Sequence, residues 1–252
     1  EEFAPYGYLK ATDIQFTVED TEKVQHVEMK DEVPTGSIVI NKDGEFVTDI
    51  NLMKGHWYDF IFNYFKESLA GVTFDVYAKE DIVSADGLGN IYHKAGEKIA
   101  TIVTDDKGIA KIENLPCGKY YLVETKTLDG FVLDETPIDA DLSYVDQNTR
   151  VVYAGMDVTN ERQKVKITVT KTDSETKKAL EGAVFGLFAK EDIVNKEGKV
   201  IVKADTQIER AVSGKDVKLT FVSDLPLCKY YVKELEAPKG YVKSDKVFDV
   251  DA

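Results

Sequence analysis

The sequence predicts an all-β chain of tandem immunoglobulin-like β-sandwich domains, and three observations carry this prediction. Short segments that alternate apolar and polar residues follow one another, separated by turn residues. No convincing pattern of a long helix interrupts them. The stretch at residues 120–131 returns at 230–241 and, cut short, at 1–8. Because each return marks one structural unit, we expect one sandwich to be repeated along the chain.

The expected strands follow the same order in each unit. In the first, strands at 14–18 and 27–31 precede a short linker at 33–36. The second opens with a strand at 37–42, ended by Asp43-Gly44. Its further strands are at 71–78, 101–104, 109–112, 151–153 and 156–160, with the repeated stretch among them. The third opens at 165–171, and its residues 182–193 match 71–82 almost place for place.

These patterns divide the chain into three parts. Residues 1–33 are expected to be the C-terminal fragment of a preceding domain. Residues 34–162 are expected to form a complete domain with an aromatic-rich insertion at about 45–67. Residues 163–252 are expected to form a domain that lacks its last strand. The chain is therefore interpreted as a fragment of a longer protein, with short linkers that favour a stiff rod.

Composition excludes several classes of partner. The 252 residues are 43% hydrophobic, which is enough for packed cores, and the net charge is -14. This charge argues against nucleic acid or an anionic membrane surface as a partner, since either needs clustered Lys and Arg. No apolar run is long enough to span a bilayer, and no signal peptide or sorting tail is visible.

Motifs for cofactors and metals are also missing from the sequence. There is no Ser-His-Asp set, glycine-rich phosphate loop or zinc spacing, and the three His residues are scattered. We expect neither a cofactor nor a metal site. Cys117 and Cys228 sit in different copies of the repeat, so a disulfide between them is not expected.

Three polar side chains fall in phase with apolar stripes of the expected strands. Side chains two residues apart share a face of a strand. The stripes are Ile38, Ile40 and Lys42; Tyr120, Leu122 and Glu124; and Met156, Val158 and Asn160. Lys171, Glu234 and Asp31 end similar stripes in the other units. Because a lone buried Lys or Glu is costly, we expect the Lys, Glu and Asn or Asp to meet.

Such a trio has a specific chemistry. Burial in an apolar core favours a neutral lysine amine, which is a nucleophile, and a protonated carboxylic acid, which can polarise an amide carbonyl and shuttle a proton. Attack of Lys42 on Asn160 would give an amide and release ammonia; with Asp31 as acceptor, water would leave instead. The alternative is a solvated Lys, a surface salt bridge and an Asn in a turn. The recurrence of the trio in phase favours the first interpretation.

The units resemble the Cna protein B-type, or SpaA-type, domains of Gram-positive surface adhesins and pilins. The likeness rests on Lys42 and Lys171, on residues 69–78 and 180–189, on the Tyr-x-Leu-x-Glu-x-x-Ala-Pro-x-Gly-Tyr pattern and on a terminal Asn. It implies Lys–Asn or Lys–Asp isopeptide bonds with the Glu as catalytic residue. Lys42, Glu124 and Asn160 then form one set. Lys171 and Glu234 lack an acceptor, and Glu1 and Asp31 lack a Lys.

The sequence departs from the family pattern in two places. Thr127-Leu128 replaces Ala-Pro, which is expected to loosen the turn after Glu124. The Tyr-Pro-Lys-Asn motif that pilins use for polymerisation is absent, which argues against a polymerising shaft pilin. The unmatched residues also suggest a hypothesis, in which residues 1–33 of one molecule complete the third unit of another by strand addition.

The function that this resemblance implies is structural. We expect stalk modules of an extracellular, cell-wall-anchored surface protein whose partners are its own neighbouring domains, with no catalysis beyond one self-directed reaction. An alternative is an adhesin module that binds a host matrix protein or glycan through Trp57 and Tyr58; an inserted strand packed on the sandwich explains the same aromatics. A glycosidase using Glu124 and Asp139 is a third interpretation, which would require turnover on polysaccharide.

Overall fold

A computed structural model of the chain describes all residues except 21, 54–58, 216–217 and 252. The described residues form strands joined by turns and loops, and none of them lies in a helix. The all-β prediction is therefore confirmed. The chain divides into two compact units. Unit 1 comprises residues 1–43, 68–129 and 133–160; unit 2 comprises residues 44–67, 130–132 and 161–252.

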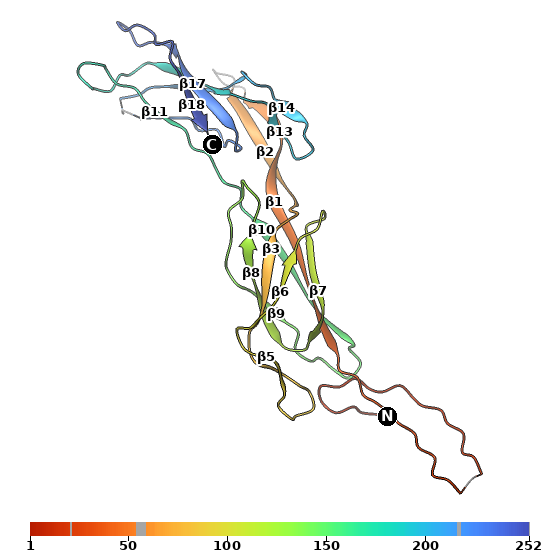
Figure 1. Cartoon of the computed structure of the whole chain (residues 1–252). Coiled ribbons are helices and arrows are strands. Elements are labelled where there is room, and N and C mark those ends of the chain that lie inside the picture. The colour runs from red at the N-terminus through yellow and green to blue at the C-terminus, as the bar shows by residue number, and fades with distance from the viewer. Residues whose placement is uncertain (21, 54–58, 216–217, 252) are drawn as a thin grey trace. The chain divides into compact units, whose positions relative to one another are not determined.

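Unit 1 is a sandwich of two sheets (Figure 1). One sheet has the strand order β6-β3-β8-β9; in the other, β1 lies between β10 and β7. The strands are β1 (Thr35–Met53), β3 (Thr73–Ala78), β4 (Ile82–Val83), β5 (Ile91–His93), β6 (Lys98–Val103), β7 (Ile109–Pro116), β8 (Lys119–Lys126), β9 (Ile138–Asp141) and β10 (Val151–Asn160). Alternate residues of β8 are buried, which places one face of this strand in the core.

Unit 2 repeats much of this arrangement. Its larger sheet has the order β15-β12-β17-β18, and a second sheet pairs β11 with β16. The strands are β2 (Asp59–Ser68), β11 (Thr168–Thr170), β12 (Val184–Ala189), β13 (Ile193–Val194), β14 (Val200–Val202), β15 (Gln207–Val212), β16 (Lys218–Thr220), β17 (Lys229–Glu236) and β18 (Val247–Asp251). By order and pairing, β11, β12, β17 and β18 are the counterparts of β1, β3, β8 and β9. The expected strand at 165–171 is shorter than predicted, with β11 and an isolated bridge at Val165.

The expected end of the first strand at Asp43-Gly44 is wrong. Strand β1 continues to Met53 and so contains residues of both units. Gly44 allows close packing here instead of a turn: a Cβ atom at this position would lie 2.4 Å from Cε1 of Phe131. Gly and Asp often mark turns, so the sequence alone predicts a turn at this place. The contact of Gly44 with Phe131 cannot be predicted from the sequence.

The aromatic-rich stretch at 45–67 packs on the core of unit 2. β2 pairs with β1, and Phe62, only 4% exposed, belongs to the apolar cluster of unit 2, which includes Phe185, Leu187 and Val232. Phe60 and Tyr64 pack against the same cluster, as alternate residues of one strand should. The buried Arg162 guanidinium stacks 3.7 Å from the Tyr64 ring centre. The sequence assigned this insertion to the domain at 34–162; by its contacts it groups with unit 2.

The strands expected at 14–18 and 27–31 do not form. A strand needs a hydrogen-bonded neighbour, and residues 12–20 and 22–30 are exposed. The linker expected at 33–36 is also wrong, because β1 begins at Thr35 and Pro34 is buried.

Candidate functional site

The side chains of Lys42, Glu124 and Asn160 meet inside unit 1. Lys42 Nζ donates a hydrogen bond of 2.5 Å to Asn160 Oδ1 and lies 3.2 Å from Glu124 Oε2. Asn160 Nδ2 donates a 2.5 Å hydrogen bond to Glu124 Oε1. All three residues are at most 2% exposed. Each member of the trio therefore contacts the other two, away from bulk water.

Strand phase places these side chains. Lys42 follows the fully buried Ile38 and Ile40 on one face of β1, and Glu124 follows Tyr120 and Leu122 on β8 in the same way. Asn160 is the last residue of β10, which pairs with β1. Because β1 and β8 belong to facing sheets, their inward side chains converge in the core.

Burial controls the charge state of the nucleophile. Loss of hydration lowers the pKa of the Lys42 amine, and this effect outweighs the attraction of Glu124, which acts in the opposite direction. A larger fraction of Lys42 is therefore neutral near physiological pH than for a lysine in water. A neutral amine has the free electron pair that nucleophilic attack requires.

Thr127 is a contact that sequence analysis missed. Its Oγ1 accepts a 2.7 Å hydrogen bond from Asn160 Nδ2, so the carboxamide nitrogen has two acceptors, Thr127 and Glu124. These bonds orient the carboxamide with its oxygen towards Lys42. The signal in the sequence is a Thr at a place where the repeat pattern has Ala, and this departure by itself predicts only a looser turn.

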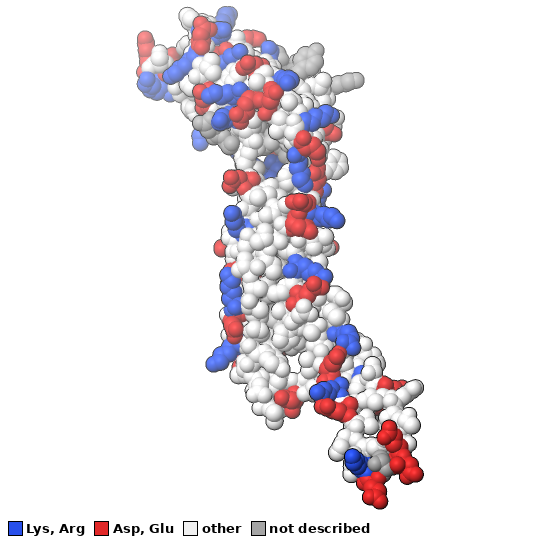
Figure 2. All heavy atoms as spheres, turned by 45° about the vertical axis from the view of Figure 1, so that its right-hand side comes forward, with Lys and Arg blue, Asp and Glu red and all other residues white. Residues whose placement is uncertain are grey.

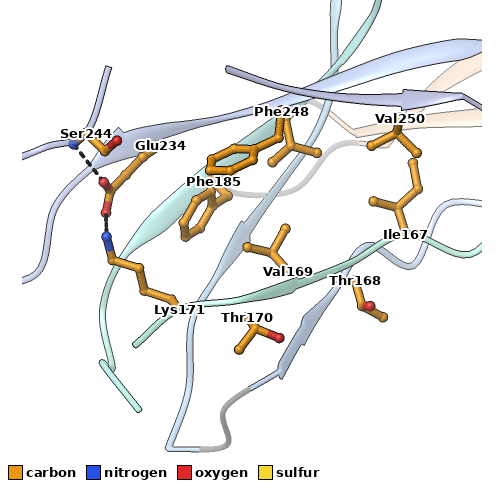
Figure 3. A pocket seen from close by; sticks show the side chains of 11 residues that line it. Ile167, Thr168, Val169, Thr170, Lys171, Phe185, Glu234, Ser244, Phe248 and Val250 are labelled. Carbon is orange, nitrogen blue, oxygen red and sulfur yellow. Dashed lines mark hydrogen bonds and ion pairs between the residues drawn. The ribbon is translucent and has the colours of Figure 1, made fainter. Parts of the chain in front are cut away.

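Unit 2 contains two of the three components. Lys171 Nζ lies 3.0 Å from Glu234 Oε1, and Glu234 Oε2 accepts a 2.9 Å hydrogen bond from the Ser244 backbone N–H (Figure 3). The Lys171 side chain is 20% exposed, whereas that of Lys42 is fully buried. Asp31, the other predicted acceptor, lies in the unpaired N-terminal segment of unit 1.

Trp57 and Tyr58 lie outside the described residues, so their proposed ligand-binding role stays a prediction.

Among the described residues there is no group of three or more His, Cys, Asp or Glu side chains placed to hold a metal ion. The same residues contain no helix that is long and apolar enough to cross a membrane. On the face drawn in Figure 2, acidic and basic side chains are interspersed. Cys117 and Cys228 are both free thiols.

Comparison with known families identifies the repeated unit. The SpaA prealbumin-like fold domain matches residues 64–157 and again residues 165–252. The chain belongs to the SpaA prealbumin-like fold family. Two tandem copies of the SpaA domain thus cover most of the sequence, in agreement with the resemblance of its motifs. No curated protein matches the chain.

The chain is also similar to several solved structures. The Bacillus anthracis TIE protein is 25% identical, with a TM-score of 0.56 over 88% of this chain and 32% of its own; the chain thus spans about a third of that protein. A streptococcal ancillary pilin is 21% identical, with a TM-score of 0.33 over 96% of this chain and 70% of its own. The shaft pilin SpaA from Lactobacillus rhamnosus GG is 21% identical, with a TM-score of 0.31 over 86% of this chain and 94% of its own.

Proposed function

We propose that the chain is a structural stalk segment of a Gram-positive surface protein, and that unit 1 is locked by an autocatalytic isopeptide bond between Lys42 and Asn160. The observation that carries this proposal is the buried contact of Lys42 Nζ with Asn160 Oδ1, with Glu124 against both residues. Nucleophile, electrophile and proton carrier are thus in van der Waals or hydrogen-bond contact before any reaction.

The reaction balances without a cofactor. The neutral Lys42 amine attacks Cγ of Asn160, and a tetrahedral intermediate forms. Glu124 accepts a proton from the attacking nitrogen and delivers one to the departing carboxamide nitrogen, which leaves as ammonia. The products are a secondary amide between the two side chains and one ammonia molecule. Because the nucleophile is consumed, each chain reacts once, and the protein is not an enzyme in the sense of repeated turnover.

The packing of unit 1 would lower the barrier of this reaction. Close approach of two buried side chains replaces a bimolecular encounter with a step inside one folded body, which is worth up to about 7–11 kcal/mol of the barrier in well-oriented cases. Exclusion of water also favours the neutral amine and protects the intermediate from hydrolysis.

A bond at this place would have a mechanical role. It would join β1 to β10, the first and last strands of unit 1, across a sequence separation of 118 residues. A pulling force applied through these strands would then pass through a covalent bond and bypass the core. Such resistance to force suits a stalk segment. Its partners would be the neighbouring domains of the same protein, which the stalk would keep at a distance from the cell wall. Membership of the SpaA prealbumin-like fold family supports the proposed extracellular location.

Intact mass tests this proposal. The chain is expected to weigh one ammonia less than its sequence, and Lys42→Ala, Glu124→Ala and Asn160→Ala are each expected to restore the full mass. Asn160→Asp offers a sharper control, because the acceptor is then a carboxylic acid and the loss becomes one water. Asn41→Ala alters another contact between β1 and β10, an exposed hydrogen bond to Asp157, and should leave the ammonia deficit intact. A full, unmodified mass for the parent chain would refute the proposal.

A further inference from the structure

A hollow on the surface of unit 2 lies beside the paired strands β1 and β2 (Figure 1). Its volume is about 580 Å³, which is within the usual range for small-molecule sites, and its lining residues all belong to unit 2. Strand β1 contributes Glu45, Asp49 and Asn51 to the lining, and β2 contributes Asn63 and Phe65 among others. The lining is therefore rich in carboxylate and amide groups, with aromatic rings among them.

Arg162 also lines the hollow, although its side chain is only 7% exposed. Its guanidinium group stacks on the Tyr64 ring, and its Nη2 pairs with Asp224. Its Nε has no hydrogen-bond acceptor among the described residues, because Glu45 Oε2, at 3.8 Å, is too distant for a hydrogen bond. A buried N–H group without an acceptor is costly, and an oxygen atom of a bound molecule would satisfy it.

The charges around the hollow nearly cancel. Its carboxylates belong to Glu45, Asp49 and Asp224, and its cationic groups to Arg162 and Lys164. A phosphate or sulfate group would be repelled by the carboxylates, and an ammonium group by the guanidinium and the lysine. Among the described residues no group of three or more His, Cys, Asp or Glu is placed to hold a metal ion. The lining therefore favours an uncharged ligand that carries many polar groups.

A carbohydrate has these properties. Each sugar hydroxyl both donates and accepts a hydrogen bond, as the carboxamides of Asn51 and Asn63 also do. Asn63 Nδ2 donates to the Asp49 carboxylate, so these two side chains are held in place before a ligand arrives. The Phe65 ring is 61% exposed. A sugar ring has C–H groups on its faces and hydroxyls at its rim, so it can pack on Phe65 while its hydroxyls meet the polar groups.

We propose that this hollow is a binding site for a neutral carbohydrate, in addition to the structural role of the chain. Phe65 would pack against a sugar ring, and Arg162 Nε would donate to one of its oxygen atoms. Asn51, Asn63 and Asp49 would bind the hydroxyl groups at its rim. The site shares no residue with the buried trio of unit 1, so it does not depend on the proposed bond.

An array of immobilised glycans tests the proposal. The full chain is applied to neutral oligosaccharides of galactose, N-acetylglucosamine and mannose, with sialylated and sulfated glycans on the same surface. Because a single open site binds weakly, the chain is biotinylated and presented on streptavidin, which gains avidity. Binding to at least one neutral glycan is expected. Binding to none of the neutral glycans, or to the charged glycans alone, overturns the proposal.

Exposed substitutions locate the site on the molecule. Phe65→Ala should weaken the binding of the neutral glycan by about tenfold or more, because the sugar loses its apolar contact. Asn51→Ala, at an exposed position of β1, should weaken it as well. Ile61→Ala is the matched control: Ile61 is 44% exposed on the same face of β2 as Phe65 but lies outside the hollow, so binding should be unchanged. Thermal unfolding checks that each variant is folded like the parent. A folded Phe65→Ala chain that binds the glycan as tightly as the parent does overturns the proposal.

Discussion

Lys42 on β1 and Asn160 on β10 touch in the core of unit 1, with 2.5 Å between Nζ and Oδ1. A buried amine is costly unless another group compensates it, and here the compensation comes from a carboxamide and a carboxylate that are themselves buried. A hydrophobic trio would stabilise the core more simply. The proposed bond gives these three reactive groups a reason to be buried together, and it leads to the following predictions.

Loss of the bond should lower the stability of unit 1. By analogy with a disulfide that closes a loop of similar length, the bond contributes about 5 kcal/mol through the unfolded state. Asn160→Ala is therefore expected to reduce the free energy of unfolding by at least that amount, measured by denaturant titration. The Asn160→Asp chain, which forms the same amide, is expected to match the parent. Equal stability of the Asn160→Ala chain and the parent would contradict this prediction.

The unreacted site should make stability depend on pH. In the Asn160→Ala chain, Lys42 remains an amine whose pKa is lowered by burial in the folded state. Between that pKa and the ordinary lysine value, the unfolded state binds more protons than the folded state. The free energy of unfolding should therefore rise with pH across this window, with a limiting slope of about 1.4 kcal/mol per pH unit. Adding Lys42→Met should remove this rise; a slope that survives the second change would speak against the assignment.

Thr127 should affect the rate of bond formation. Thr127→Val keeps the shape of the side chain and removes one acceptor of the Asn160 carboxamide. The loss of one such hydrogen bond, about 0.5–1.5 kcal/mol, corresponds to a reaction slower by roughly two- to tenfold. Pulse-labelled chains can be followed on a denaturing gel, where the cross-linked form migrates faster. Thr127→Ser retains the hydroxyl and should react at nearly the parent rate, so identical rates for Val and Ser would count against a positioning role.

Strand β2 should stabilise unit 2. Phe62→Ala removes a ring that is only 4% exposed in the core of that unit and should cost about 3–5 kcal/mol. The neighbouring Phe65 is 61% exposed, so Phe65→Ala should change stability by less than about 0.5 kcal/mol. Hydrogen exchange reports on each unit separately. Loss of protection in β3 and β8 of the Phe62→Ala chain, with β12 and β17 unchanged, would show that Phe62 supports unit 1 instead and would contradict the prediction.

Much of the fold and of the site could be predicted because both depend on strand alternation. The period of two is enough to place Lys42, Glu124 and Asn160 on inward faces of their strands. Their contact follows from a second argument, that a lone Lys or Glu in a core is costly unless it is paired. The recurrence of the same residue types in other copies of the repeat supports this argument.

What sequence reasoning missed depends on tertiary context. Gly44 looked like the end of a strand, although it makes room for the ring of Phe131. The segments at 14–18 and 27–31 have strand patterns but no partner, and a pattern alone does not provide hydrogen bonds. Thr127 was overlooked because it departs from the motif, and its contact with Asn160 depends on how the turn after β8 folds.

The central claim is the bond between Lys42 and Asn160, and tandem mass spectrometry of a proteolytic digest tests it most directly. The predicted result is one branched peptide that contains both residues, lighter by one ammonia than its two parts, and absent from a Glu124→Ala chain. Recovery of the Lys42 peptide and the Asn160 peptide as separate, unmodified species from the folded parent protein would contradict the account.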